Sequence, residues 1–177
     1  MRSLARIIPS CIMLVAVTCG SACLALDLDP ATVRQALVVG QEPAGATTPS
    51  AARQKLNATP QKIVVAGRIG ARGMEPFLEK KASFVLVEIP ADDHAKKPGH
   101  DDDNCPFCKK RNAGSPMVAV QFLGADGKVI PLDARALFGV QKGQDVVVSG
   151  MGVFDAKLAI PVIQLTADSI HVRPAAR

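Results

Sequence analysis

The fold is decided by residues 145–150, whose sequence DVVVSG is a run of β-branched side chains ending at a glycine. Two other runs have the same character, VVAGRI at 64–69 and LTADSIHV at 165–172. Val and Ile favour strands, and Gly, Pro and Asp separate such runs as turn formers. Because only 3% of the chain is aromatic, with six Phe and no Trp or Tyr, a core must be built mainly from aliphatic residues. The sequence predicts an all-β domain and excludes a large aromatic stacking surface.

Five strands are predicted from these runs and the turns between them. They lie at 62–70, 83–89, 117–123, 145–153 and 160–172. We expect the last one to break near Ala167 and Asp168. Residues 133–138 predict a short helix between the third and fourth strands, capped by Asp133 and ended by Gly139. Three strands, a short helix and two strands are the element order of a five-stranded Greek-key barrel of the OB type.

Two of these strands alternate between apolar and polar residues, which indicates one buried face in each. The residues expected on these faces are Val118, Val120 and Phe122 in the third strand, and Val85, Val87 and Ile89 in the second.

Residues 62–174 resemble an OB-fold domain of the kind found in anticodon-binding and exported bacterial proteins. The resemblance covers about two-thirds of the chain and rests on the runs at 64–69, 145–150 and 165–172. It implies a small closed barrel and carries no catalytic identity. Strands bend at glycine when such a barrel closes, because a side chain would obstruct the bend. The glycines expected at these bends are Gly67, Gly70, Gly150 and Gly152.

The first 25 residues have the three parts of a secretory signal peptide. Arg2 and Arg6 precede an uncharged apolar run at 7–26 that ends in small residues. A membrane-spanning anchor is the alternative, although Pro9 and Gly20 shorten the strongly apolar part below the roughly 20 residues that a span needs. Export to the periplasm or cell envelope is therefore expected.

Cys23 follows Gly20, Ser21 and Ala22, which loosely resembles the bacterial lipoprotein signal. In that signal the cysteine becomes the lipidated first residue, but Leu usually stands where this chain has Gly20. A soluble secreted product cleaved near Ala22 or Ala25 and a lipid anchor on Cys23 both stay open. Membrane contact is expected only through the signal or this anchor.

Residues 26–60 are predicted to form a flexible tether with one short helix, at 31–39. Asp29 is placed to cap this helix, and Pro30 fits its first turn. The remainder consists mainly of Ala, Thr, Pro, Ser and Gln, with Leu56 as its only large aliphatic residue after the helix. Little apolar surface is available there to offset the entropy of ordering the chain. We therefore expect the folded domain to span 61–174.

A long polar insertion, 90–116, separates the second and third predicted strands. Its residues from 91 to 115 include no Val, Ile, Leu or Met, so burial cannot hold the segment in place. Loops of this length inside a compact domain are usually functional or disordered. The residues of metal-ligand type within it are His94, His100, Asp101, Asp102, Asp103, Cys105 and Cys108.

The Cys-x-x-Cys pair in this insertion predicts a metal site. Cys105 and Cys108 place two thiolates on one side of a tight turn, and His94 and His100 complete a set of two sulfur and two nitrogen ligands. Such a set suits zinc, and copper also accepts thiolate and imidazole ligands. The expected cofactor is zinc or copper, and the expected partners are this ion and a protein of the cell envelope.

Two other interpretations of the pair stay open. Exported proteins meet oxidising conditions, so Cys105 and Cys108 could form a plain structural disulfide. The sequence CPFC is also similar to the active turn of glutaredoxin-like and disulfide-exchange proteins. That motif opens a helix in an α/β fold, whereas here we predict a loop in a β barrel.

The remaining candidate ligands are interpreted as solvated groups. The acidic run 101–103 is balanced by the nearby bases Lys109, Lys110 and Arg111. His171 lies between Ile170 and Val172 on the last strand, where we expect it to point outward and be exposed.

Charge and composition disfavour nucleic acid as a partner. Without Arg2 and Arg6 the chain carries 19 bases against 16 acids, a weak excess, and single-strand binders need aromatic platforms. No Ser, His and Asp constellation and no paired carboxylates on strands indicate an enzyme. The expected function is therefore an exported, non-enzymatic OB-fold module that binds a metal ion. The alternatives are a nucleic-acid-binding OB-fold domain and a thiol-disulfide oxidoreductase.

Overall fold

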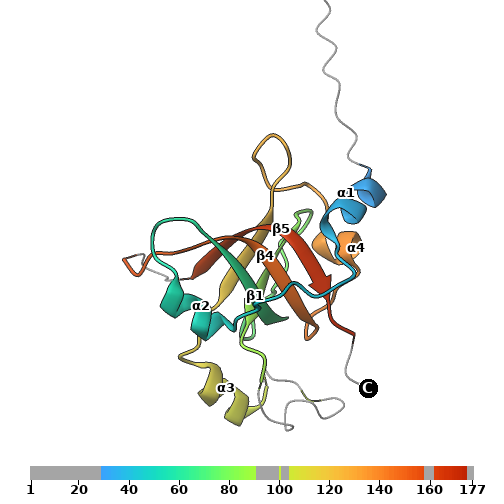
Figure 1. Ribbon diagram of the computed structural model, residues 1–177. Coiled ribbons are helices and arrows are strands. Elements are labelled where there is room, and N and C mark those ends of the chain that lie inside the picture. The colour runs from blue at the N-terminus through green and yellow to red at the C-terminus, as the bar shows by residue number, and fades with distance from the viewer. Residues whose placement is uncertain (1–28, 91–99, 101–103, 158–161, 175–177) are drawn as a thin grey trace, which may run out of the picture.

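The computed structural model describes residues 29–90, 100, 104–157 and 162–174. Its five strands close into a barrel in the order β1-β2-β3-β5-β4 (Figure 1). Neighbouring strands are antiparallel except β3 and β5, which are parallel. The all-β, OB-like architecture is therefore confirmed. The strands are β1 (Gln61–Ile69), β2 (Ser83–Val87), β3 (Val118–Phe122), β4 (Asp145–Phe154) and β5 (Ile163–Val172).

The expected break in the last strand is a β-bulge. β5 runs without interruption, but Ser149 pairs with Ser169 while Gly150 pairs with Ala167, so Asp168 is the extra residue. A Cβ atom on Gly150 would lie only 2.2 Å from the Thr166 carbonyl oxygen, which no side chain tolerates. The bulge bends the strand pair without ending it, because the hydrogen-bond ladder resumes on both sides.

The core fills the barrel with aliphatic side chains and a row of phenylalanine rings. The ring centroids of Phe84 and Phe122 lie 6.2 Å apart, and those of Phe122 and Phe138 lie 4.6 Å apart. Val118, Val120 and Phe122 face inward from β3, as predicted.

The predicted buried face of β2 is wrong. Phe84 and Leu86 are buried, whereas Val85 and Val87 are only partly buried and Ile89 follows the strand. Both faces of this strand are apolar, so alternation could not distinguish them. The register with β3, which pairs Phe84 with Val120, places the larger side chains in the core.

Helix α4 (Ala134–Phe138) lies between β3 and β4 as predicted. The Asp133 side chain accepts a hydrogen bond from the Arg135 N–H, and Gly139 ends the helix at a φ of 69°, a left-handed conformation that favours glycine. Leu137 and Phe138 are buried against the barrel.

The segment predicted as a flexible tether is instead packed on the barrel over its described part. Helix α1 (Pro30–Leu37) begins at the Asp29 cap, and helix α2 (Pro49–Lys55) was not predicted. Leu56 and Ala52 of this segment belong to the core, with exposed fractions of 7% and 0%.

Backbone hydrogen bonds explain why a segment with few large apolar residues is ordered. The Val39 N–H donates to the Ile170 carbonyl at 2.9 Å, and Thr47 both donates to Val64 and accepts from Ala66 at the edge of β1. These bonds depend on the chain trace and not on side-chain hydrophobicity, so composition could not predict them. The chain that follows α1 also contacts His171, which is partly buried. The His171 Nδ1 atom lies 3.1 Å from the Val39 carbonyl oxygen. The expectation of an exposed His171 is therefore wrong.

The signal peptide predicted at 1–25 lies outside the described residues. Among the helices that are described, none combines the length and the apolar character needed to cross a membrane.

Candidate metal centre

The insertion predicted as a plain loop contains helix α3 (Pro106–Asn112). Cys105 is the residue before its first turn, and proline at the first helical position is favoured because it has no N–H to leave unbonded. Cys108 therefore lies in the first turn, three residues after Cys105. The helix lies below α2, on the far side of the barrel from α1 and α4 (Figure 1).

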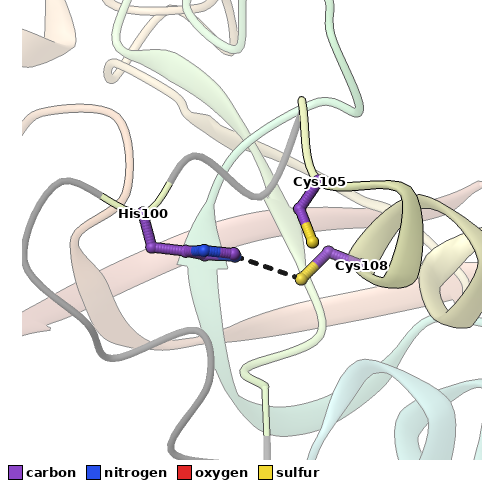
Figure 2. Close-up of side chains that lie close together, drawn as sticks. All are labelled: His100, Cys105 and Cys108. Atoms are coloured by element: carbon purple, nitrogen blue, oxygen red, sulfur yellow. Dashed lines mark hydrogen bonds between the residues drawn. The ribbon is translucent and has the colours of Figure 1, made fainter.

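Three of the predicted ligands converge at the start of α3. The candidate donor atoms of His100, Cys105 and Cys108 all lie within 4.8 Å of one another. His100 Nε2 is 3.2 Å from Cys108 Sγ, and Figure 2 shows the imidazole ring directed at this sulfur. Both cysteines are thiols in this structure. The sequence thus identified a cluster that the fold does assemble.

The two cysteines differ in their exposure to solvent. Cys108 is completely buried, whereas Cys105 and His100 are partly exposed. Cys108 nevertheless lies outside the core cluster of the barrel.

Hydrogen bonds link the end of α3 and the chain after it to the barrel. The Arg72 guanidinium, in the loop after β1, donates to the Ala113 carbonyl at 3.3 Å. Beyond the helix, the Ile163 N–H donates to the Met117 carbonyl at 3.0 Å, which ties the segment to the start of β5. The chain just after α3 is thus attached to the barrel, and none of the three cluster residues belongs to a strand.

The remaining residues of metal-ligand type in the insertion lie outside the described residues. His94 and the acidic run 101–103 are among them, so the structure assembles three of the four residues predicted to hold the metal. Within the described part of the chain, His100, Cys105 and Cys108 form the one group of His, Cys, Asp or Glu side chains whose donor atoms lie close enough together to hold an ion.

The donor set suits a soft or borderline ion. Zinc binds thiolate at about 2.3 Å and imidazole at about 2.0 to 2.1 Å, so donors around one ion are separated by roughly 3.5 Å. Donor atoms within 4.8 Å of one another therefore need only small side-chain rotations to enclose an ion. Two sulfurs and one nitrogen do not suit magnesium or calcium, which prefer oxygen. These three residues could hold zinc or copper.

A second concave feature lies beside the C-terminal end of α3. A hollow of about 440 Å³ is lined by residues of α2, of the chain after α3 and of β4, and the Arg53 guanidinium lies 5.4 Å from the centre of the Phe154 ring. No sequence pattern indicates this hollow, because it depends on the packing of α2. The lining residues are Ser50, Arg53, Gln54, Gly114, Pro116 and Phe154.

No protein-family model and no curated protein matches the chain. Among solved structures, an aspartyl-tRNA synthetase from Entamoeba histolytica is similar over 80% of this chain, with 8% identity and a TM-score of 0.43. A protein from Leishmania major Friedlin assigned as an aspartyl-tRNA synthetase is similar over 83%, with 11% identity and a TM-score of 0.42. This chain covers only 26% of either protein. At these scores the likeness carries no argument, and the OB-like fold rests on the strand topology.

Proposed function

We propose that this chain is an exported, non-enzymatic binding module whose OB-like barrel carries a zinc or copper ion. Cys105, Cys108 and His100 hold the ion, and His94, six residues before His100 in the sequence, is the proposed fourth ligand. The observation that carries the proposal is the convergence of three donor atoms within 4.8 Å of one another.

The character of the segment supports a metal for a physical reason. Residues 91–115 include no large aliphatic side chain, so a shared ion would supply the constraint that hydrophobic burial cannot. The contact between His100 and Cys108 also places the two ligand types side by side before an ion arrives. The cost of ordering the ligands is thereby reduced.

The distribution of aromatic rings does not favour nucleic acid. Five of the six phenylalanines are buried in the core, and only Phe107 is exposed, at 78%. A single-stranded nucleic acid needs successive aromatic surfaces on which its bases stack. The metal proposal is therefore the better supported of the two.

The proposal is tested by competition titration of the reduced full-length chain with zinc and with Cu(I), together with elemental analysis. We expect one ion per chain, and loss of that ion in the Cys105→Ser/Cys108→Ser double variant. His100→Gln should weaken binding by at least about tenfold, as expected when one ligand of a tetrahedral site is lost. His171→Gln is the matched control, because it removes a histidine that does not belong to the cluster and should leave the affinity unchanged.

Protons should compete with the ion, so affinity is expected to fall below about pH 6. His94→Gln tests the fourth ligand in the same titration. A reduced wild-type chain that binds neither ion, or a His94→Gln/His100→Gln variant with unchanged affinity, would show that the proposed site does not exist.

Export is supported by the sequence of residues 1–25 alone. Mass spectrometry of the chain from an expressing bacterium tests it. A product beginning near Cys23 or Leu26 is expected, and diacylglycerol on Cys23 would identify the lipid-anchored form. A mature protein that retains the basic residues Arg2 and Arg6 would contradict export.

A further inference from the structure

The two sulfurs of the Cys-x-x-Cys turn are chemically unequal in this fold. Cys108 is 0% exposed, whereas Cys105, just outside the first turn of α3, is partly exposed. We therefore expect a dissolved oxidant to reach Cys105 more readily than Cys108. Thiol reactivity toward an external reagent follows access as well as thiolate character.

The same two sulfurs are close enough to react with each other. Both lie within the 4.8 Å cluster, and Figure 2 shows both side chains on the same side of the turn. Residues three apart at the start of a helix are neighbours on its surface. Side-chain rotation can bring the sulfurs to the bonding distance of about 2.05 Å.

We propose that Cys105 and Cys108 form a redox couple in which Cys105 is the entry thiol and Cys108 the resolving thiol. In the first step the Cys105 sulfur attacks one sulfur of a small disulfide such as oxidised glutathione. A Cys105 mixed disulfide forms, and one glutathione thiol leaves with the proton that Cys105 lost. In the second step the Cys108 sulfur attacks the Cys105 sulfur. The internal disulfide forms, and the second glutathione leaves with the proton of Cys108.

Oxidation and metal binding exclude each other at this site, a consequence that rests on the proposed function. The internal disulfide uses both sulfurs, so it removes two of the ligands at once and releases the ion. A bound ion in turn occupies the thiolate that would attack the oxidant. The couple would then set whether the exported protein holds its metal under oxidising conditions.

The test follows oxidation of the reduced, metal-free full-length chain by oxidised glutathione, with alkylation of remaining thiols and mass spectrometry at each time point. Cys11, Cys19 and Cys23 are replaced by serine in every sample, so that two thiols remain. The wild-type pair should give the internal disulfide through a transient adduct of one glutathione on Cys105. Cys108→Ser should stop at that adduct, and Cys105→Ser should react at least about tenfold more slowly, because its remaining thiol is buried.

Denatured samples are the control for burial. In concentrated urea, Cys105→Ser and Cys108→Ser should react at similar rates, because the difference in access is then lost. Equal rates in the folded proteins, or a wild-type chain that accumulates two glutathiones without an internal disulfide, would overturn the proposal. If either variant fails to fold, the position of the transient glutathione adduct in the wild-type pair tests the order of reaction. An adduct found first on Cys108 contradicts the assigned order.

A zinc arm separates this inference from the proposed function. Zinc should slow oxidation of the wild-type pair, and His100→Gln should weaken that protection while the internal disulfide still forms. If zinc neither binds nor protects, the metal proposal fails and the redox couple stands. If zinc binds but the internal disulfide never forms, the metal proposal stands and the redox couple fails.

Discussion

The barrel and the segment between β2 and β3 are held by different forces. The strands are joined by a closed ladder of backbone hydrogen bonds around side chains such as Val148 and Leu165, which are 0% exposed. Between β2 and β3, none of the described residues belongs to the core cluster, and the segment is attached through a few polar contacts, including that of Arg72 with Ala113. The candidate site thus lies outside the core cluster of the barrel, and we expect substitutions there to leave the barrel folded.

The largest expected effect comes from the barrel. Val148→Asp would bury a carboxylate with no partner in the closing strand β4, at a cost of several kcal/mol against a total stability of roughly 5 to 15 kcal/mol. We expect the domain to unfold, as followed by circular dichroism. Met151→Asp is the control on the same strand, because Met151 is 42% exposed, and it should fold normally. Similar melting of both variants would contradict the assigned core face of β4.

The next effect tests whether α2 belongs to the barrel or to a tether. Leu56→Ala should lower the free energy of unfolding by about 2 to 4 kcal/mol, because Leu56 is in the core and packs where Gly152 leaves room. The neighbouring Lys55→Ala, at an exposed position, should have almost no effect. Chemical denaturation measures both. An unchanged midpoint for Leu56→Ala would restore the tether, as would a protease-resistant fragment starting near residue 61.

A smaller effect is expected from the cysteine turn. In the metal-free protein, Cys105→Ser/Cys108→Ser should change the free energy of unfolding by less than about 1 kcal/mol, because Cys108 is buried outside the core cluster. Thermal melts under reducing conditions measure the change, with the exposed Lys110→Ala as a reference for a silent substitution. A loss as large as that of Leu56→Ala would show that the turn is part of the barrel's stability after all.

The smallest effect is a pH dependence at the cap of α4. Hydrogen bonds from the Arg135 side chain lower the pKa of Asp133 to about 2, against the partial desolvation that raises it. The pKa is lower in the folded state, so the stabilisation is present above about pH 4 and is lost as the pH falls toward 2. Asp133→Asn keeps the hydrogen-bonded cap but removes the charge. It should lower the free energy of unfolding by less than about 1 kcal/mol at pH 5, because the Asp133–Arg135 ion pair is partly solvated. The difference between variant and wild type should shrink in denaturation curves as the pH falls toward 2, and a constant difference would contradict this assignment.

The site was predictable in its membership but not in its geometry. The grouping of His100, Cys105 and Cys108 in one polar segment is visible in the sequence, because these residues are close along the chain. The start of α3 at Pro106 was missed, although proline after a capping position is a helix signal. Which cysteine is buried depends on what packs against the turn, and no local pattern encodes that.

Local sequence patterns predicted the five strands, the capped helix α4, the first helix with its Asp29 cap and the segment that carries the candidate ligands. These features follow from side-chain periodicity and from residues with strong local preferences, which act over a few positions. The folded structure was needed to show which face of β2 is buried, how residues 38–56 pack on β1 and β5, and which cysteine is exposed. Each of these depends on contacts between segments far apart in the sequence, made partly through backbone groups that every residue carries, so no local pattern could encode them.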